Sequence, residues 1–287
     1  MAAFVLASAL VFLVATGRAD AYVYWTNSKD GTVGRADLNG KGATEQFIRS
    51  TTSGALGGAG MVVHGGYVYW TGANGGTATT IARAKLNGSA VNTHFITTGV
   101  TNPCGITIAG SHIYWVGDNG TGIGRANLNG SGVDQSFVPT GTGVCGVAVR
   151  GAYIYWANYR ANTIGRANLD GTAANPNFIT GASDDASIVV TGSYIYWANG
   201  HGGANSIGRA KLDGSGVNQT FIGNLNGIVS VTADRNYLYW TIWNPNGANN
   251  TGALIGRARL NGTAVNRHFI AGAQGPFGIA VDSRGPK

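Results

Sequence analysis

One histidine and two carboxylates could do chemistry together in this sequence. Asp184 and Asp185 are adjacent, and His201 follows in a later segment. An imidazole close to a carboxylate can act as a general base or acid. The three residues support one hypothesis, an exported lyase or hydrolase. A solvated acidic loop is the simpler explanation of the two aspartates.

A second set of side chains suits ligand binding. Tyr159 is followed by Arg160, and Trp243 and Phe277 add two aromatic rings later in the chain. Exposed Trp, Tyr and Arg side chains anchor protein and sugar ligands because they offer a large apolar surface with a polar group. With His201, these residues form the candidate binding set. The alternative is that the rings lie flat over loop glycines.

These candidates stand on a repeat that occurs six times. Each unit contains Y-x-Y-W or a close variant, and the spacing between successive tryptophans is 45, 45, 41, 41 and 43 residues. A period of this length is typical of β-propeller blades. The six tryptophans are Trp25, Trp70, Trp115, Trp156, Trp197 and Trp240.

Each unit predicts four strands. Y-x-Y-W and I-G-R-A-x-L alternate with period two, as strands do, and an Asn-Gly or Asp-Gly turn leads to a third strand ending in Phe-Ile or Phe-Val. A G-I-x-V segment supplies the innermost strand. Charged residues make up only 11% of the chain and 48 of its 287 residues are glycine, which excludes helical bundles. The prediction is an all-β, six-bladed propeller with four antiparallel strands per blade.

The two ends of the chain have different roles in this scheme. Gly278-Ile279-Ala280-Val281 matches the innermost-strand pattern, so we expect the C-terminal strand to close the ring by completing the first blade. Residues 1–21 have no strand position left. Residues 1–17 contain no charged side chain, the segment ends in Ala19-Asp20-Ala21, and it is too short to span a bilayer, which predicts a signal peptide. Residues 22–287 would then form a single propeller domain.

The order G-I-A-V, Y-I-Y-W and I-G-R-A-N-L-D-G resembles the YWTD propellers of low-density-lipoprotein-receptor type over residues 22–284. The resemblance implies a six-bladed fold and a rigid extracellular scaffold that binds partners on one face. The aspartate of Y-W-T-D is absent from every unit. Its positions hold Asn27, Gly72, Gly117, Asn158, Asn199 and Ile242.

Differences in length among the repeats identify a variable face. Twelve residues separate the repeat Arg from the repeat Phe in every unit, whereas the Trp-to-Arg interval ranges from 10 to 17 residues. The Phe-to-Gly interval also varies. In a propeller these two connections emerge on the same face, where loops can change without disturbing the core. Tyr159, His201 and Trp243 fall in such loops and would form one arc.

Two cysteines occupy equivalent places in neighbouring units. Cys104 and Cys145 each precede the innermost-strand glycine. In an exported protein they could form a disulfide at the channel mouth. Two small apolar thiols are the alternative, because neighbouring inner strands could lie further apart than the roughly 7 Å that a disulfide spans.

Other cofactor and partner classes have little support. Glu45, the only glutamate, falls in the interval of fixed length, which places it opposite the variable face. We expect no metal and no cofactor, and the sequence holds no phosphate-binding loop. The net charge is +7. However, six of the fourteen arginines occupy one repeat position and form no local patch, so we expect no nucleic-acid partner. We expect these six to have structural roles, with hydrogen bonds to backbone carbonyls or to the Asn after Tyr-Trp.

The sequence therefore predicts a monomer that is secreted or held at the cell-envelope exterior, without stable membrane insertion. It would bind an extracellular protein, peptide or glycan through its variable loops. The alternatives are the lyase or hydrolase with its site at the channel mouth, and a purely structural envelope module.

Overall fold

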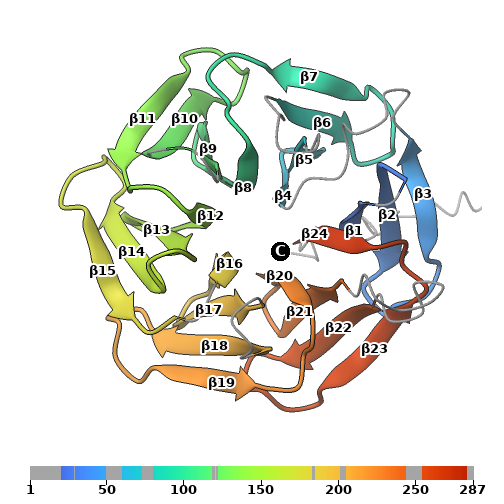
Figure 1. Ribbon diagram of the computed structural model, residues 1–287. Coiled ribbons are helices and arrows are strands. Elements are labelled where there is room, and N and C mark those ends of the chain that lie inside the picture. Colours follow the sequence, from blue (N-terminus) through green and yellow to red (C-terminus); the bar gives the residue numbers. More distant parts are fainter. Residues whose placement is uncertain are drawn as a thin grey trace, which may run out of the picture.

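The computed structural model describes residues 21–28, 30–49, 60–72, 80–117, 120, 122–182, 185–200, 205–243 and 254–282, with only the backbone at 185 and 186. Within these ranges, six four-stranded antiparallel sheets surround a central axis (Figure 1). The predicted six-bladed propeller is confirmed.

The strands of each blade follow in order from the innermost to the outermost. Blades one to three are β24 (Pro276–Val281), β1 (Tyr22–Asn27), β2 (Thr32–Asp37) and β3 (Thr44–Arg49); β4 (Met61–His64), β5 (Tyr67–Thr71), β6 (Ile81–Lys85) and β7 (Asn92–Ile96); β8 (Pro103–Ala109), β9 (His112–Gly117), β10 (Gly122–Asn127) and β11 (Asp134–Pro139). Blades four to six are β12 (Val144–Arg150), β13 (Tyr153–Asn158), β14 (Thr163–Asn168) and β15 (Asn175–Thr180); β16 (Asp185–Val190), β17 (Tyr194–Asn199), β18 (Ser206–Lys211) and β19 (Asn218–Ile222); β20 (Ile228–Ala233), β21 (Tyr237–Ile242), β22 (Leu254–Arg259) and β23 (Asn266–Ala271).

The C-terminal strand closes the ring. β24 pairs antiparallel with β1, so that Val23 faces Val281 and Trp25 faces Ile279. The first blade therefore takes its inner strand from one end of the described chain and its other three strands from the opposite end. This confirms the predicted closure, and it fixes the two ends by the same hydrogen bonds that hold the sheet.

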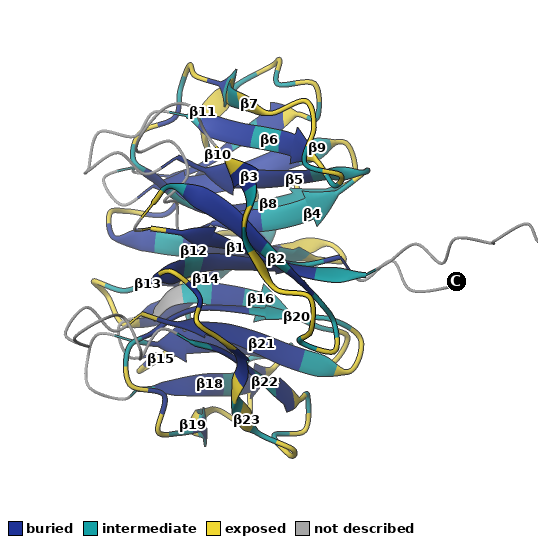
Figure 2. Cartoon of the chain, turned by 90° about the vertical axis from the view of Figure 1, so that its right-hand side faces the viewer, coloured by how far each residue is buried: buried dark blue, intermediate teal, exposed yellow. Residues whose placement is uncertain are grey.

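Each repeat Trp lies in the second strand of its blade and packs against the third strand. Trp156 is fully buried, and a Cβ atom added to Gly165 would collide with its indole ring. Four other blades have the same Trp and Gly pair, whereas blade two has Ala82 opposite Trp70. Figure 2, an edge-on view, shows that buried residues cover most of the length of many strands, whereas exposed residues gather in the turns. The apolar surface thus lies between blades, where neighbouring sheets cover each other.

Five of the six repeat arginines stack between two aromatic rings of their own blade, and Arg125 stacks on Phe137. The Arg35 guanidinium carbon lies 4.1 Å from the Tyr22 ring centre and 3.9 Å from that of Phe47. The sequence predicted carbonyl or Asn partners but not this cation–π stacking, which stabilises the arginine because the ring faces are electron-rich. The carbonyl partner occurs for Arg166 and Arg257, which donate to Leu212 and Leu38 of the next blade.

A β-bulge occurs near the start of the innermost strand in five blades. The extra residue turns out of the regular register and leaves the ladder locally unpaired. Bulge residues whose side chains are described are Cys104, Cys145, Val229 and Phe277. The residue after each bulge is Gly or Ser. At Gly146 a Cβ would stand 3.0 Å from the Ile188 nitrogen of the next blade, so a small residue allows the inner strands to approach.

Candidate functional site

The connections between blades, and those between the second and third strands, leave from the same end of the blades. We call this end the variable face, and the end that carries the other two turns the constant face. Tyr159 follows β13 directly and Trp243 follows β21 directly, so they occupy equivalent positions in blades four and six. As expected, both belong to the variable face. The two blades are not neighbours, and each residue has its own surroundings.

Trp243 and Phe277 form an aromatic pair across the junction of blades six and one. Their ring centres are 6.0 Å apart with an interplanar angle of 75°, an edge-to-face arrangement. The Trp243 backbone nitrogen donates to the Gly227 carbonyl at 2.8 Å, and the ring lies near Gly275, where an added Cβ would be 3.7 Å from Cδ1. Nevertheless 38% of Trp243 is exposed. The ring both rests on a loop glycine and offers free apolar surface.

We call the variable-face residues that contact the segments just before the inner strands the rim. Tyr159 and Arg160 form its part in blade four, as Trp243 does in blade six. Arg160 Nε donates to the Tyr159 hydroxyl at 3.2 Å, and its guanidinium carbon is 5.7 Å from the tyrosine ring centre. The Tyr159 backbone nitrogen donates to the Gly143 carbonyl at 3.0 Å. Gly143 has a φ of 83° and no side chain, which leaves room for the aliphatic stem of Arg160. Arg160 is exposed, so its charge faces solvent at the channel mouth.

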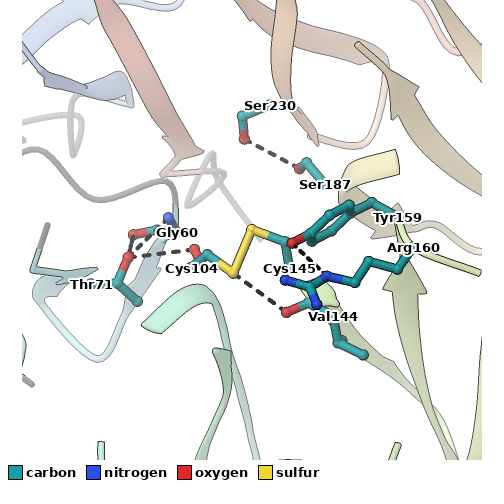
Figure 3. The surroundings of a disulfide bond; sticks show 9 residues. All are labelled: Gly60, Thr71, Cys104, Val144, Cys145, Tyr159, Arg160, Ser187 and Ser230. Carbon is teal, nitrogen blue, oxygen red and sulfur yellow. Dashed lines mark hydrogen bonds between the residues drawn. A yellow bond between two sulfur atoms is a disulfide. The ribbon is translucent and has the colours of Figure 1, made fainter. Parts of the chain in front are cut away.

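A disulfide joins Cys104 to Cys145 close to this rim (Figure 3). Their Cα atoms are 5.1 Å apart, within the usual range for a disulfide. Both residues are bulge residues of adjacent inner strands, and the bulge explains how two strands around an open axis bring their cysteines together. The sequence revealed their equivalent positions but not the bulge. In Figure 3, Tyr159 and Arg160 lie beside Cys145.

The central channel holds a cavity of about 190 Å³. Its lining contains the two cysteines, aliphatic residues, and the hydroxyl groups of Thr107, Ser187, Ser230 and Thr232. Ser187 and Ser230 take the place of the repeat glycine in blades five and six, and their hydroxyl oxygens are 3.2 Å apart. The small volume and this lining suit water or the tip of a ligand side chain.

The structure contradicts the predicted position of Glu45, which was the face opposite the variable face. Its carboxylate accepts hydrogen bonds from Trp25 Nε1 and from the Gln274 backbone nitrogen, both at 3.2 Å. Gln274 belongs to the connection between blades six and one, so Glu45 contributes to the variable face. The physical reason is a register shift between β2 and β3 after the Arg35–Thr44 pair. Burial raises the pKa of the Glu45 carboxyl, with the hydrogen bond from Trp25 opposing the shift.

The alternative catalytic group is mostly outside the described residues. His201 and Asp184 lie outside the described residues. Asp185 is the first residue of β16, and only its backbone is described. In the described part of the chain, no cluster of three or more His, Cys, Asp or Glu side chains could hold a metal ion. Within the same ranges no helix is long and apolar enough to cross a membrane.

Comparison with known proteins gives structural matches only. No protein-family model matches this sequence, and no curated protein matches it. Among solved structures, the nidogen/laminin complex matches with a TM-score of 0.68 and 17% identity over 91% of this chain and 98% of that chain.

Two lyase structures also match. A streptogramin B lyase has a TM-score of 0.61 and 21% identity, with coverage of 90% of this chain and 83% of that chain. A virginiamycin B lyase from Staphylococcus aureus has a TM-score of 0.58 and 21% identity, with coverage of 86% and 80%. At these identities the likeness concerns the fold, and it agrees with the YWTD-type propeller that the sequence resembles. The same fold serves in a binding complex and in lyases.

Proposed function

We propose that this chain is an exported binding scaffold whose variable face binds an extracellular protein, peptide or glycan. The observation that carries the proposal is the exposed Trp243 ring, held edge-on against Phe277 at the rim of the channel. An aromatic side chain fixed in this way loses little conformational entropy when a ligand covers it. Tyr159 and Arg160 add a second anchor with hydrogen-bonding capacity on the same face.

Three further observations support this proposal. The pairing of β24 with β1 closes the ring of blades, so we expect the rim residues to keep their spacing when a ligand binds. The apolar N-terminal segment ending in Ala19-Asp20-Ala21 has the pattern of an export signal. The nidogen/laminin match is a complex between proteins. The lyase or hydrolase alternative would require His201 with Asp184 or Asp185.

The exposure of Trp243 also supplies the test. The six repeat tryptophans are at most 3% exposed, whereas Trp243 is 38% exposed. Acrylamide should therefore quench mainly Trp243, and a ligand bound at the variable face should protect it. Peptide and glycan libraries can be screened for this protection, and hits confirmed by calorimetry with the Tyr159→Ala, Trp243→Ala double variant.

A matched control comes from the constant face. Val217 is 44% exposed in the turn between β18 and β19, and Val217→Ala removes exposed apolar surface without touching the rim. We expect the double variant to fold with nearly unchanged thermal stability and to lose ligand binding. We expect the Val217→Ala control to keep ligand binding. Hits that bind the double variant as well as the parent would refute the proposed face.

A further inference from the structure

A cavity of about 740 Å³ lies on the constant face, where blades four, five and six meet. Its lining comes from the ends of the inner strands β12, β16 and β20, and from neighbouring turns in blades five and six. Three of these lining residues are arginines, Arg150, Arg209 and Arg235, and Asp234 is the one carboxylate among them. This cavity is separate from the variable face, so an inference about it does not depend on the function proposed above.

Two of the arginines depart from the repeat. The position of Arg150 holds His64, Ala109 and Thr191 in blades two, three and five, and Arg235 stands where four blades have glycine. The repeat arginine recurs in all six units, whereas these two positions vary. Both are exposed, Arg150 as the last residue of β12 and Arg235 in the turn between β20 and β21. They are located on either side of the blade-five hairpin turn, and Arg150 reaches it: a Cβ on Gly192 would be 3.6 Å from Arg150 Nη2.

The third arginine differs from two of its counterparts in its hydrogen bonds: its guanidinium donates to the Tyr196 hydroxyl. Arg166 and Arg257 donate to the carbonyls of Leu212 and Leu38 in the following blade, at 3.5 and 2.8 Å. For Arg209 the equivalent acceptor is the Leu260 carbonyl, which the Tyr196 hydroxyl occupies at 2.9 Å.

Arg209 Nε is buried without a hydrogen-bond partner. Its guanidinium stays between the Tyr194 and Phe221 rings, at 4.4 and 4.0 Å from their centres. A fixed cation with an unsatisfied donor favours an anionic ligand.

Asp234 offsets only one of the three positive charges. Its carboxylate accepts hydrogen bonds from the Asn236 and Tyr237 backbone nitrogens, both at 2.7 Å, and from the Tyr239 hydroxyl at 2.9 Å. These bonds hold the hairpin turn that carries Arg235. The carboxylate therefore positions an arginine, and the cavity keeps an excess of positive charge.

We propose that this cavity binds an acidic saccharide, a hydroxylated sugar bearing a carboxylate or sulfate group. A lone oxyanion would fill only a small part of 740 Å³. The rest of the lining mixes aliphatic surface from Val189 and Leu260 with hydroxyl and amide groups. A sugar ring matches this mixture because it presents apolar C–H faces and hydroxyl edges. Arg150 and Arg235 bind the anionic group, and Arg209 supports it from the cavity wall.

Calorimetric titration of the full chain at low salt tests the proposal with four probes: trigalacturonate, a sulfated lactose, lactose and inorganic sulfate. We expect at least one acidic sugar to bind, and lactose and sulfate to bind at least about tenfold more weakly. Arg150→Ala and Arg235→Ala should each weaken the acidic sugar by about tenfold. Lys85→Ala, which removes an exposed charge from the same face in blade two, should have no effect.

Each outcome supports or overturns the proposal. Inorganic sulfate binding as tightly as the sugars would mean a bare anion site, and lactose binding equally well would mean that the arginines do not select charge; either result overturns the proposal. The proposal is also overturned if Lys85→Ala weakens binding of the acidic sugar as much as the arginine variants do, or if none of the four probes binds. The Tyr159→Ala, Trp243→Ala variant should bind the acidic sugar normally, which distinguishes this site from the variable face.

Discussion

Arg257 and Leu38 are hydrogen-bonded across the closure of the ring. Arg257 Nη1 donates to the Leu38 carbonyl at 2.8 Å, although the two residues are 219 positions apart in the chain. This bond joins blade six to blade one on the constant-face side, while the β24–β1 pairing closes the ring within blade one. The closure thus has a side-chain contribution as well as a backbone one.

This relationship predicts that Arg257→Lys destabilises the fold by about 1–2 kcal/mol, measured by urea unfolding, because lysine keeps the charge but loses the planar stack and the carbonyl bond. Arg209→Lys is the matched control. Arg209 stacks between the equivalent two rings of blade five, but the carbonyl equivalent to that of Leu38, which belongs to Leu260, accepts from the Tyr196 hydroxyl instead. Its loss should be smaller. Equal losses would show that the Arg257–Leu38 bond contributes nothing measurable.

Glu45 predicts a pH dependence of stability. Burial raises the pKa of its carboxyl in the folded state, so the protonated form is favoured there. The stabilisation from this group is fully present below the ordinary glutamate pKa and is lost as pH rises through the raised folded value. Glu45→Gln keeps an acceptor for Trp25, as Gln219 does for Trp197 at 3.2 Å. It should melt higher than the parent at neutral pH.

The difference between Glu45→Gln and the parent should disappear near about pH 4, where the parent carboxyl is protonated. Glu45→Ala should be less stable than both proteins at each pH, because Trp25 Nε1 and the Gln274 backbone nitrogen lose their acceptor. Thermal melts of the three proteins across pH would check this. A gap between parent and Glu45→Gln that is the same at every pH would contradict the assigned cause.

The disulfide predicts a mass and a stability effect. The intact protein should be about two hydrogen masses lighter than its reduced form, and Cys104 and Cys145 should resist alkylation until a reductant is added. The two residues are 41 positions apart, so the double Ala variant should lose about 2–4 kcal/mol of unfolding free energy. Full alkylation without reductant would show free thiols.

The contacts of the repeat Trp predict that the residue opposite it tolerates different changes in different blades. Gly165→Ala should destabilise by about 1–3 kcal/mol, because its methyl group overlaps the Trp156 ring and the blade must shift. Blade two already accommodates Ala82, which is fully buried opposite Trp70. Ala82→Gly should instead cost about 1 kcal/mol through a lost buried methyl group. Equal tolerance of both changes in denaturant unfolding would argue against the close ring contact.

The repeat explains why the fold could be predicted. Period-two alternation fixes which side chains face a neighbouring blade, and the constant Arg-to-Phe spacing fixes two of the turns. Counting residues between the repeats predicted that Gly278–Val281 closes the ring. Comparing the six units also identified Tyr159 and Trp243 as residues that packing does not require, and both lie on the expected face.

The sequence by itself determined the six blades, the closing strand and the face on which the loops vary, because these follow from local alternation and from counting between repeats. Only the tertiary structure decided which side chains meet. The bulges that bring Cys104 to Cys145, the edge-to-face contact of Trp243 with Phe277, and the position of Glu45 depend on register shifts and on neighbouring blades. Such contacts join segments far apart in the chain, and a pattern of period two carries no information about them.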